Sequence, residues 1–305
     1  MSSPAPPRLR ALRHVALRTT ALEESVAFYS GPWGLELVER TPDAAYLRAS
    51  GPEHHVLELH AAQANALDHV AFALPTPAEV DAAAAWAEAE GAVLLDRPGP
   101  LDRPGAGYGF RFLDPENRVL EISALVHAVP ERPLDVPVPR KVAHVVLNTT
   151  DIDALTAWYT RVLGLRVSDW SEHQMVFLRA NADHHVVAFN QAEWAAPNHV
   201  AYEVGSLDAW LRSIGRLKVA GHETAWGPGR HGPGDNAFAY YVDPAGLVPE
   251  MTAEVLQIDE DTWMPRVWPR IPELSDLFRT AGPPSPDIRR HMGGVPDPGW
   301  ARPAG

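Results

Sequence analysis

The spacing of apolar residues changes repeatedly between two patterns along this chain. In the second half, short alternating runs typical of strands surround two longer segments with helical spacing. The helices are expected over residues 151–163, with Asp151 or Asp153 as the N-cap, and over residues 207–219. One strand is expected to begin near His144, and further strands are expected over residues 174–179, 185–189, 199–204, 238–242 and 248–252. The pattern therefore predicts the order β-α-β-β-β, occurring twice in this half.

The first half of the chain repeats the second at an offset of about 130 residues. His14 matches His144, and the pair His54-His55 matches His184-His185. The segment 112–121, with an Asp-Pro turn and a final Glu, returns as segment 241–250, one residue short of that offset. Agreement of order and spacing over such a length indicates a duplication.

The duplication predicts an α+β protein of four βαβββ modules arranged in two tandem domains. The domains are expected over residues 8–129 and 140–256. A Pro-rich linker over residues 130–139 would join them, and a Pro- and Trp-rich tail over residues 257–305 has no counterpart in the repeat.

Composition narrows the possible partners and metal ligands. The chain has no cysteine, which excludes disulfides and thiolate metal sites, so any metal must be held by His, Asp or Glu. A net charge of -13, from 26 basic and 39 acidic residues, argues against binding to nucleic acid. No apolar run reaches the length of a membrane span or a secretory signal, so we expect a cytoplasmic protein with no membrane partner.

Three residues on expected strands carry the candidate chemistry: His144, His199 and Glu250. Glu250 shares its strand face with Val248 and Thr252. An ionised carboxylate on an apolar face is costly unless it is paired or binds a metal. Each residue alone is more simply a core histidine or a surface glutamate. Together, at strand positions of a duplicated framework, two imidazoles and one carboxylate indicate the facial triad of non-heme Fe(II) oxygenases.

The segment from Gly229 to Glu250 resembles the type I extradiol dioxygenases of the vicinal oxygen chelate superfamily. That family has a His, an aromatic stretch with a Tyr, the motif Asp-Pro-x-Gly and then the ligand Glu, with the spacings that separate His231, Tyr240 and Glu250 here. The resemblance covers roughly residues 8–255 and implies two vicinal-oxygen-chelate domains, each a pair of modules forming a curved half-barrel sheet.

The resemblance also implies a role for each matching residue. His144, His199 and Glu250 correspond to the metal ligands, for Fe(II) or alternatively Mn(II). His185 corresponds to the acid–base histidine beside the O2 site. Residues His231 and Tyr240 correspond to groups that hydrogen-bond the substrate oxygens, and the role of His184 is left open.

The implied function is an iron-dependent extradiol dioxygenase of aromatic catabolism. Such an enzyme inserts both atoms of O2 into a catechol-type ring and yields a ring-opened semialdehyde. The resemblance also implies a homo-oligomer. Two alternatives on the same scaffold remain open: a glyoxalase-type isomerase or hydrolase of small electrophiles, and a ligand-sequestering protein with no catalysis. The set of His185, His231 and Tyr240 argues against the first, and the intact triad argues against the second.

The first repeat keeps a matching trio, His14, His69 and Glu121. The residue ten positions before Glu121 is Arg111, where the second repeat has Tyr240. The residue nineteen positions before Glu121 is Asp102, where the second repeat has His231. An Arg beside a divalent cation opposes metal binding. We therefore expect the first domain to be structural and metal-free, and catalysis to belong to the second.

Substrate indications are weaker. Five aromatic residues are candidates for an apolar wall around a substrate ring, with ordinary core packing as the alternative: Phe177, Trp194, Trp226, Trp263 and Trp268. Trp226 stands where relatives that bind carboxylated catechols have an Arg, which argues against a short acidic side chain on the substrate. Arg230 is either a second anion-binding group or a salt-bridge residue.

Overall fold

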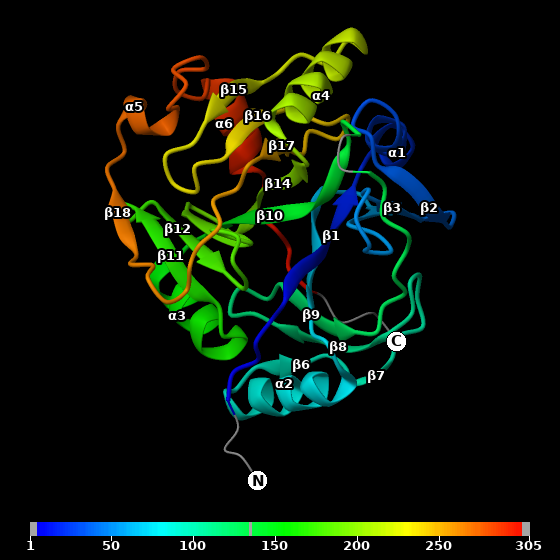
Figure 1. Ribbon diagram of the computed structural model, residues 1–305. Coiled ribbons are helices and arrows are strands. Elements are labelled where there is room, and N and C mark those ends of the chain that lie inside the picture. The colour runs from blue at the N-terminus through cyan, green and yellow to red at the C-terminus, as the bar shows by residue number, and fades with distance from the viewer. Residues whose placement is uncertain (1–4, 134–135, 301–305) are drawn as a thin grey trace.

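The computed structural model describes residues 5–133 and 136–300 (Figure 1). The expected linker includes residues 134–135 and the expected tail includes residues 301–305, and these lie outside the described residues. Among the described helices, none has both the length and the apolar character needed to cross a membrane.

The N-terminal domain is built on one nine-stranded sheet with the order β2-β3-β4-β1-β5-β9-β8-β6, in which β7 also pairs with β8. Its strands are β1 (Ala11–Thr19), β2 (Glu36–Arg40), β3 (Ala44–Arg48), β4 (Leu57–Ala61), β5 (Ala66–Ala73), β6 (Val93–Leu94), β7 (Gly99–Pro100), β8 (Tyr108–Leu113) and β9 (Val119–Ala124). Helices α1 (Leu22–Ser30) and α2 (Pro77–Ala89) follow the first strand of each module. The two modules meet where β1 pairs antiparallel with β5.

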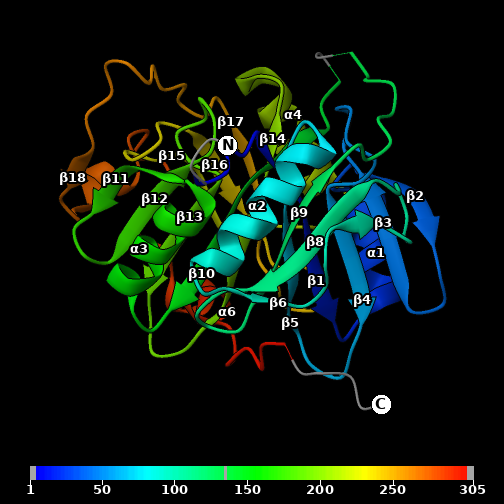
Figure 2. The same cartoon turned by 90° about the horizontal axis from the view of Figure 1, so that it is seen from below.

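The C-terminal domain repeats this plan in a second nine-stranded sheet with the order β15-β16-β17-β14-β10-β13-β12-β11-β18. Its strands are β10 (Pro139–Thr149), β11 (Arg166–Ser171), β12 (Met175–Arg179), β13 (Val187–Gln191), β14 (Ala196–Val204), β15 (Trp226–Arg230), β16 (Ala237–Tyr240), β17 (Pro249–Ala253) and β18 (Arg266–Trp268). Helices α3 (Ile152–Leu163) and α4 (Leu207–Val219) complete its two modules. Figure 2 shows α1 with β2–β4 on one side of the molecule and α3 with β11–β13 on the other.

The predicted class of four βαβββ modules in two tandem domains is confirmed. Both expected helices of the C-terminal domain are present, and Asp151 caps α3 by accepting a hydrogen bond from the backbone N–H of Ala154. Strands β11 and β15 were not located from the sequence. The first mixes charged and apolar residues, and the second reads Trp-Gly-Pro-Gly-Arg, so neither has the alternation that marks a strand.

The two domains share one continuous apolar core, and matched hydrogen bonds join them. Tyr29 on α1 donates to Asp243 Oδ2 in the C-terminal domain over 3.2 Å. Tyr159 on α3 donates to Asp114 Oδ2 in the N-terminal domain over 3.0 Å. Each acceptor is the Asp of an Asp-Pro turn, and all four groups are buried. The duplicated copies therefore stabilise each other through equivalent contacts.

The tail packs on the C-terminal domain. Its strand β18 extends the sheet by pairing in parallel with β11, and α5 (Pro272–Ser275) and α6 (Pro286–Gly293) follow it. Figure 1 shows β18 and α5 at the outer edge of the domain and α6 behind β15 and β16. The tail thus runs from the edge strand β11 to β14, which α6 contacts.

Replacing Tyr159 with Phe should destabilise the protein, because the buried Asp114 carboxylate loses a hydrogen-bond donor. The expected loss of unfolding free energy is about 1–3 kcal/mol, measured by urea denaturation. Tyr108→Phe is the matched control, since its hydroxyl donates to Asp81 at the exposed surface. Equal denaturation midpoints for the two variants would contradict the interdomain role given to Tyr159.

Candidate metal centre

The three candidate ligands come from three neighbouring strands of the C-terminal sheet. His144 lies on β10, His199 on β14 and Glu250 on β17. In the strand register, His144 and Glu250 are both paired with Ala201, and His199 is two residues away on the same strand. Because residues i and i+2 on a strand face the same side, this register brings all three side chains together.

The geometry of this cluster fits a divalent metal ion. Glu250 Oε2 lies 3.2 Å from His144 Nε2 and 3.3 Å from His199 Nε2. Two donor atoms about 2.1 Å from one ion are separated by about 3.0–3.4 Å for right-angled to tetrahedral coordination. All three residues are buried, and His199 Nε2 has no hydrogen-bond partner of good geometry within the described chain. A buried imidazole nitrogen without a partner is expected at a metal ligand.

Neighbouring amides orient two of the ligands. His199 Nδ1 donates to Asn198 Oδ1 over 2.7 Å, which leaves the lone pair of Nε2 directed at the cluster. Asn236 Nδ2 donates to Glu250 Oε1 over 3.3 Å. Burial opposes ionisation of Glu250, but His144 and His199 outweigh it and hold the pKa of this carboxyl below its ordinary value.

His185 stands beside the ligand His144, with 4.2 Å between the ring centroids. Its Nδ1 lies 3.1 Å from His184 Nδ1, and His184 Nε2 lies 3.1 Å from Asp169 Oδ2. Burial, followed by the neighbouring histidines, holds the pKa of His185 well below its ordinary value, so the ring is neutral near pH 7. His184, whose role the sequence left open, therefore positions His185. Asp169 in turn positions His184.

A second pair of groups flanks the cluster. His231 Nδ1 donates to the Ser275 carbonyl over 3.3 Å, so the Tyr240 hydroxyl donates to His231 Nε2 over 2.9 Å. Burial lowers the pKa of His231 to about 4, which keeps it a neutral acceptor. Burial, with the Glu250 charge, also raises the pKa of Tyr240 well above its ordinary value, so the hydroxyl keeps its proton.

A cavity of about 520 Å³ opens beside these groups. Its lining combines the ligands His144 and His199 with His185, His231 and Tyr240. Apolar side chains and the tail complete the wall, among them Phe177, Trp226, Trp268, Ile271, Leu274 and Met292. This volume is within the usual range for small-molecule sites.

The structure separates the aromatic candidates by position. Phe177, Trp226 and Trp268 line the cavity. Trp194 and Trp263 instead donate their indole N–H groups to the backbone carbonyls of Gly293 and Ser168.

Arg230 forms ion pairs with Asp235 and Glu254, which matches its interpretation as a salt-bridge residue. Four contributors were missed in the sequence: Asn198, Asn236, Asp169 and the tail around Ser275. The two amides directly precede His199 and the strand β16, but an Asn beside a ligand carries no distinctive pattern.

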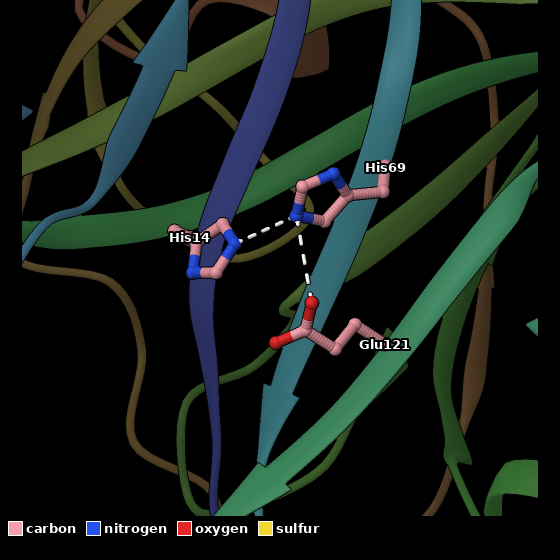
Figure 3. Close-up of side chains that lie close together, drawn as sticks. All are labelled: His14, His69 and Glu121. Carbon is pink, nitrogen blue, oxygen red and sulfur yellow. Dashed lines mark hydrogen bonds and ion pairs between the residues drawn. The ribbon is translucent and has the colours of Figure 1, made fainter. Parts of the chain in front are cut away.

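The matching trio of the N-terminal domain is also brought together (Figure 3). His14 Nε2 lies 2.9 Å from His69 Nε2, and His69 Nε2 lies 3.7 Å from Glu121 Oε2. Glu121, however, forms ion pairs with Arg103 and with Arg111, whose Nε is 3.1 Å from Oε2. Arg111 is paired across the strands with Glu121 as Tyr240 is with Glu250. The negative charge of the Glu121 carboxylate is therefore compensated by two guanidinium groups.

Replacing Asn198 with Ala should weaken metal binding, because His199 loses the acceptor that orients it. We expect a loss of about 10–100-fold in affinity, measured by competition with a chelator. Asn190→Ala is the matched control, since Asn190 and Asn198 both donate to Asn148 Oδ1 but only Asn198 contacts His199. Equal affinity in the two variants would exclude the orienting role.

Comparison with known proteins supports this reading of the fold. The Glyoxalase/Bleomycin resistance protein/Dioxygenase superfamily model matches residues 11–122 and 141–251. A manganese-dependent 2,3-dihydroxybiphenyl 1,2-dioxygenase from Geobacillus genomosp. 3 is 29% identical over 84% of this chain and 88% of its own length. Metapyrocatechase 2 from Cupriavidus necator is 28% identical, and the match spans 55% of this chain and only 58% of that protein.

Solved structures give the same architecture. A Mn(II)-bound glyoxalase from Novosphingobium aromaticivorans superposes with a TM-score of 0.88 at 38% identity, covering 92% of this chain and 94% of that one. Homoprotocatechuate 2,3-dioxygenase from Arthrobacter globiformis superposes with a TM-score of 0.81 at 22% identity, covering 94% and 92%, and supports the fold alone. The tandem domains and the matched segments establish that this chain belongs to the Glyoxalase/Bleomycin resistance protein/Dioxygenase superfamily, in which its relatives include type I extradiol dioxygenases.

Proposed function

We propose that this protein is an extradiol dioxygenase that opens a catechol-type ring with O2. His144, His199 and Glu250 would hold Fe(II), or Mn(II) as in the Geobacillus relative named for that metal. The observation that carries the proposal is a three-ligand cluster beside a roomy cavity. Three protein ligands leave coordination positions free for substrate, whereas a structural site is closed by four.

The donor set agrees with this assignment. Two neutral imidazoles and one carboxylate suit a divalent ion of the first transition row. When bound, such an ion supplies a positive charge that lowers the pKa of diol hydroxyls bound to it.

The hydrogen-bonded pair His231 and Tyr240 would orient the substrate. Ser275 fixes the tautomer of His231, and His231 in turn fixes the direction of the Tyr240 hydroxyl. The Tyr240 oxygen keeps acceptor capacity for a diol O–H, since it donates its own proton to His231. Because these groups are buried and already oriented, little reorganisation is needed when a polar substrate group arrives.

His185 is suited to move a proton. Its neutral imidazole lines the cavity next to His144, and its Nδ1 is held by the chain from His184 to Asp169. The other ring nitrogen can accept a proton from a substrate oxygen and return it later in the reaction.

The cavity wall indicates an aromatic substrate. Phe177, Trp226 and Trp268 provide apolar faces, and tail residues limit the access of water. Trp226 stacks on Tyr240 with 4.9 Å between the centroids, so it also restrains the tyrosine. Two cationic residues of the tail, Arg270 and Arg289, also line the cavity, so acidic substituents belong in a substrate screen.

A glyoxalase-type isomerase is the second candidate, favoured by the name of the Novosphingobium relative at 38% identity. It would use the same metal cluster with a thiol adduct of an α-ketoaldehyde. Unlike ring cleavage, this isomerisation consumes no O2, so one experiment separates the two.

The decisive test is anaerobic loading of the apoprotein with Fe(II) or Mn(II), followed by a panel of catechols with no, apolar or acidic substituents. Ring cleavage predicts stoichiometric O2 uptake and a yellow ring-opened product. Isomerisation of a glutathione–methylglyoxal adduct, with no O2 uptake on any catechol of the panel, would instead establish the second candidate. Glu250→Ala is the negative control for both reactions.

Replacing His185 with Phe should slow turnover by about 10²–10⁴-fold, because the proton-transfer group is removed. Metal content and catechol binding should be retained, since His185 is not one of the three ligands. His173→Phe, at an exposed position of the same domain, should leave both measurements unchanged. Loss of the metal in His185→Phe would show that the ligand assignment is wrong.

A further inference from the structure

A second cluster of histidines in the N-terminal domain surrounds a carboxylate that the duplication does not account for. Glu58 lies on β4 and is only 1% exposed. The corresponding position of the C-terminal domain is Ala188, because Glu58 pairs with Ala16 of β1 as Ala188 pairs with Val146 of β10. The first domain has therefore placed a carboxylate where its copy has a methyl group.

The contacts of Glu58 are those of a ligand cluster. Its Oε1 lies 2.9 Å from His55 Nε2, 3.0 Å from His14 Nε2 and 3.7 Å from His69 Nε2. His14 Nε2 and His69 Nε2 are themselves 2.9 Å apart, and Figure 3 marks this contact with a dashed line. His14, His55 and Glu58 thus bring three donor atoms close enough together to share one ion, with His69 beside them.

Further groups hold three of these side chains in place. His69 Nδ1 donates to Asp68 Oδ1 over 2.8 Å, which directs its Nε2 lone pair into the cluster. His60 Nε2 lies 3.0 Å from Glu58 Oε2, and His54 Nδ1 lies 3.0 Å from His55 Nδ1. A carboxylate behind a ligating histidine is a common arrangement in metal proteins.

Charge also favours an ion at this point. The Glu58 carboxylate is buried among three imidazoles, with Oε1 within 3.7 Å of His14, His55 and His69. A buried anion of this kind needs compensation by a cation.

We propose that the N-terminal domain binds a structural divalent ion, of the Zn(II) class, through His14, His55 and Glu58. This departs from the expectation of a metal-free first domain, which considered Glu121 as the carboxylate ligand. Arg103 and Arg111 neutralise Glu121, and the ligand set moves from β1, β5 and β9 to β1, β4 and the segment just before β4. Arg111 Nη2 is also 3.3 Å from His69 Nε2, so His69 is not one of the proposed ligands.

The site differs in kind from the C-terminal centre. Its three ligands are all at most 3% exposed, and none of them lines the cavity beside the C-terminal centre. The residue matching the proposed acid–base group His185, which is His55, becomes a ligand here because Glu58 is within its reach. The ion would stabilise the fold of this domain without taking part in catalysis.

The test counts zinc in variants of the full chain. Glu250→Ala removes the C-terminal site, and this variant is loaded with Zn(II), desalted and analysed by inductively coupled plasma mass spectrometry. We expect one tightly held zinc ion per chain, with an anomalous scattering peak in crystals between His14, His55 and Glu58. Adding Glu58→Ala should remove it, and Ala is the residue that the other domain carries at this position.

The matched control combines Glu250→Ala with Glu121→Gln, and this double variant should keep the zinc bound. Far-UV circular dichroism checks folding, and His55→Gln replaces Glu58→Ala if that variant does not fold. The proposal is overturned if Glu250→Ala holds no zinc, if the Glu58 or His55 variant keeps it, or if only the Glu121 variant loses it. None of these readouts requires the protein to cleave catechols.

Discussion

Bringing two imidazoles and an ionised carboxylate together in a dry interior is the constraint on which this structure depends. The sheet achieves it through register: His144, His199 and Glu250 come from three adjacent strands and face the same side. A slip of one residue in any of these strands would turn its ligand to the other face. The hydrogen bonds that Asn198 accepts from His199 and that Asn236 donates to Glu250 then restrict the ligand orientations that register alone leaves free.

Contacts between the two duplicated domains support this strand register from outside the site. Each domain supplies a helix whose tyrosine bonds the Asp-Pro turn of the other domain, Tyr29 with Asp243 and Tyr159 with Asp114. The Asp243 turn directly precedes β17, the strand that carries Glu250. The N-terminal domain thus contributes to the order of the strands that carry the candidate ligands, without lining the cavity described beside them.

The two copies also show how one framework diverges by single side chains. The positions that hold the C-terminal ligands are retained in the first domain, but Arg111 replaces Tyr240 and Glu58 replaces Ala188. These two changes neutralise one carboxylate and introduce another. The same histidine framework therefore surrounds a different carboxylate in each domain, and a cavity opens beside the C-terminal cluster.

The sequence by itself determined the modular architecture, the helices of the C-terminal domain and the candidate ligands, because periodicity and a repeat of about 130 residues are local or directly comparable properties. It did not locate β11 and β15, which lack alternation and become strands only through their neighbours in the sheet. Tertiary structure alone decided that the tail encloses the cavity, that His184 and Asp169 position His185, and that Glu58 rather than Glu121 faces His14 and His55. Most of these contacts join residues that are far apart in the chain or on different strands. The spacing of residues along one strand does not reveal how close two such side chains lie.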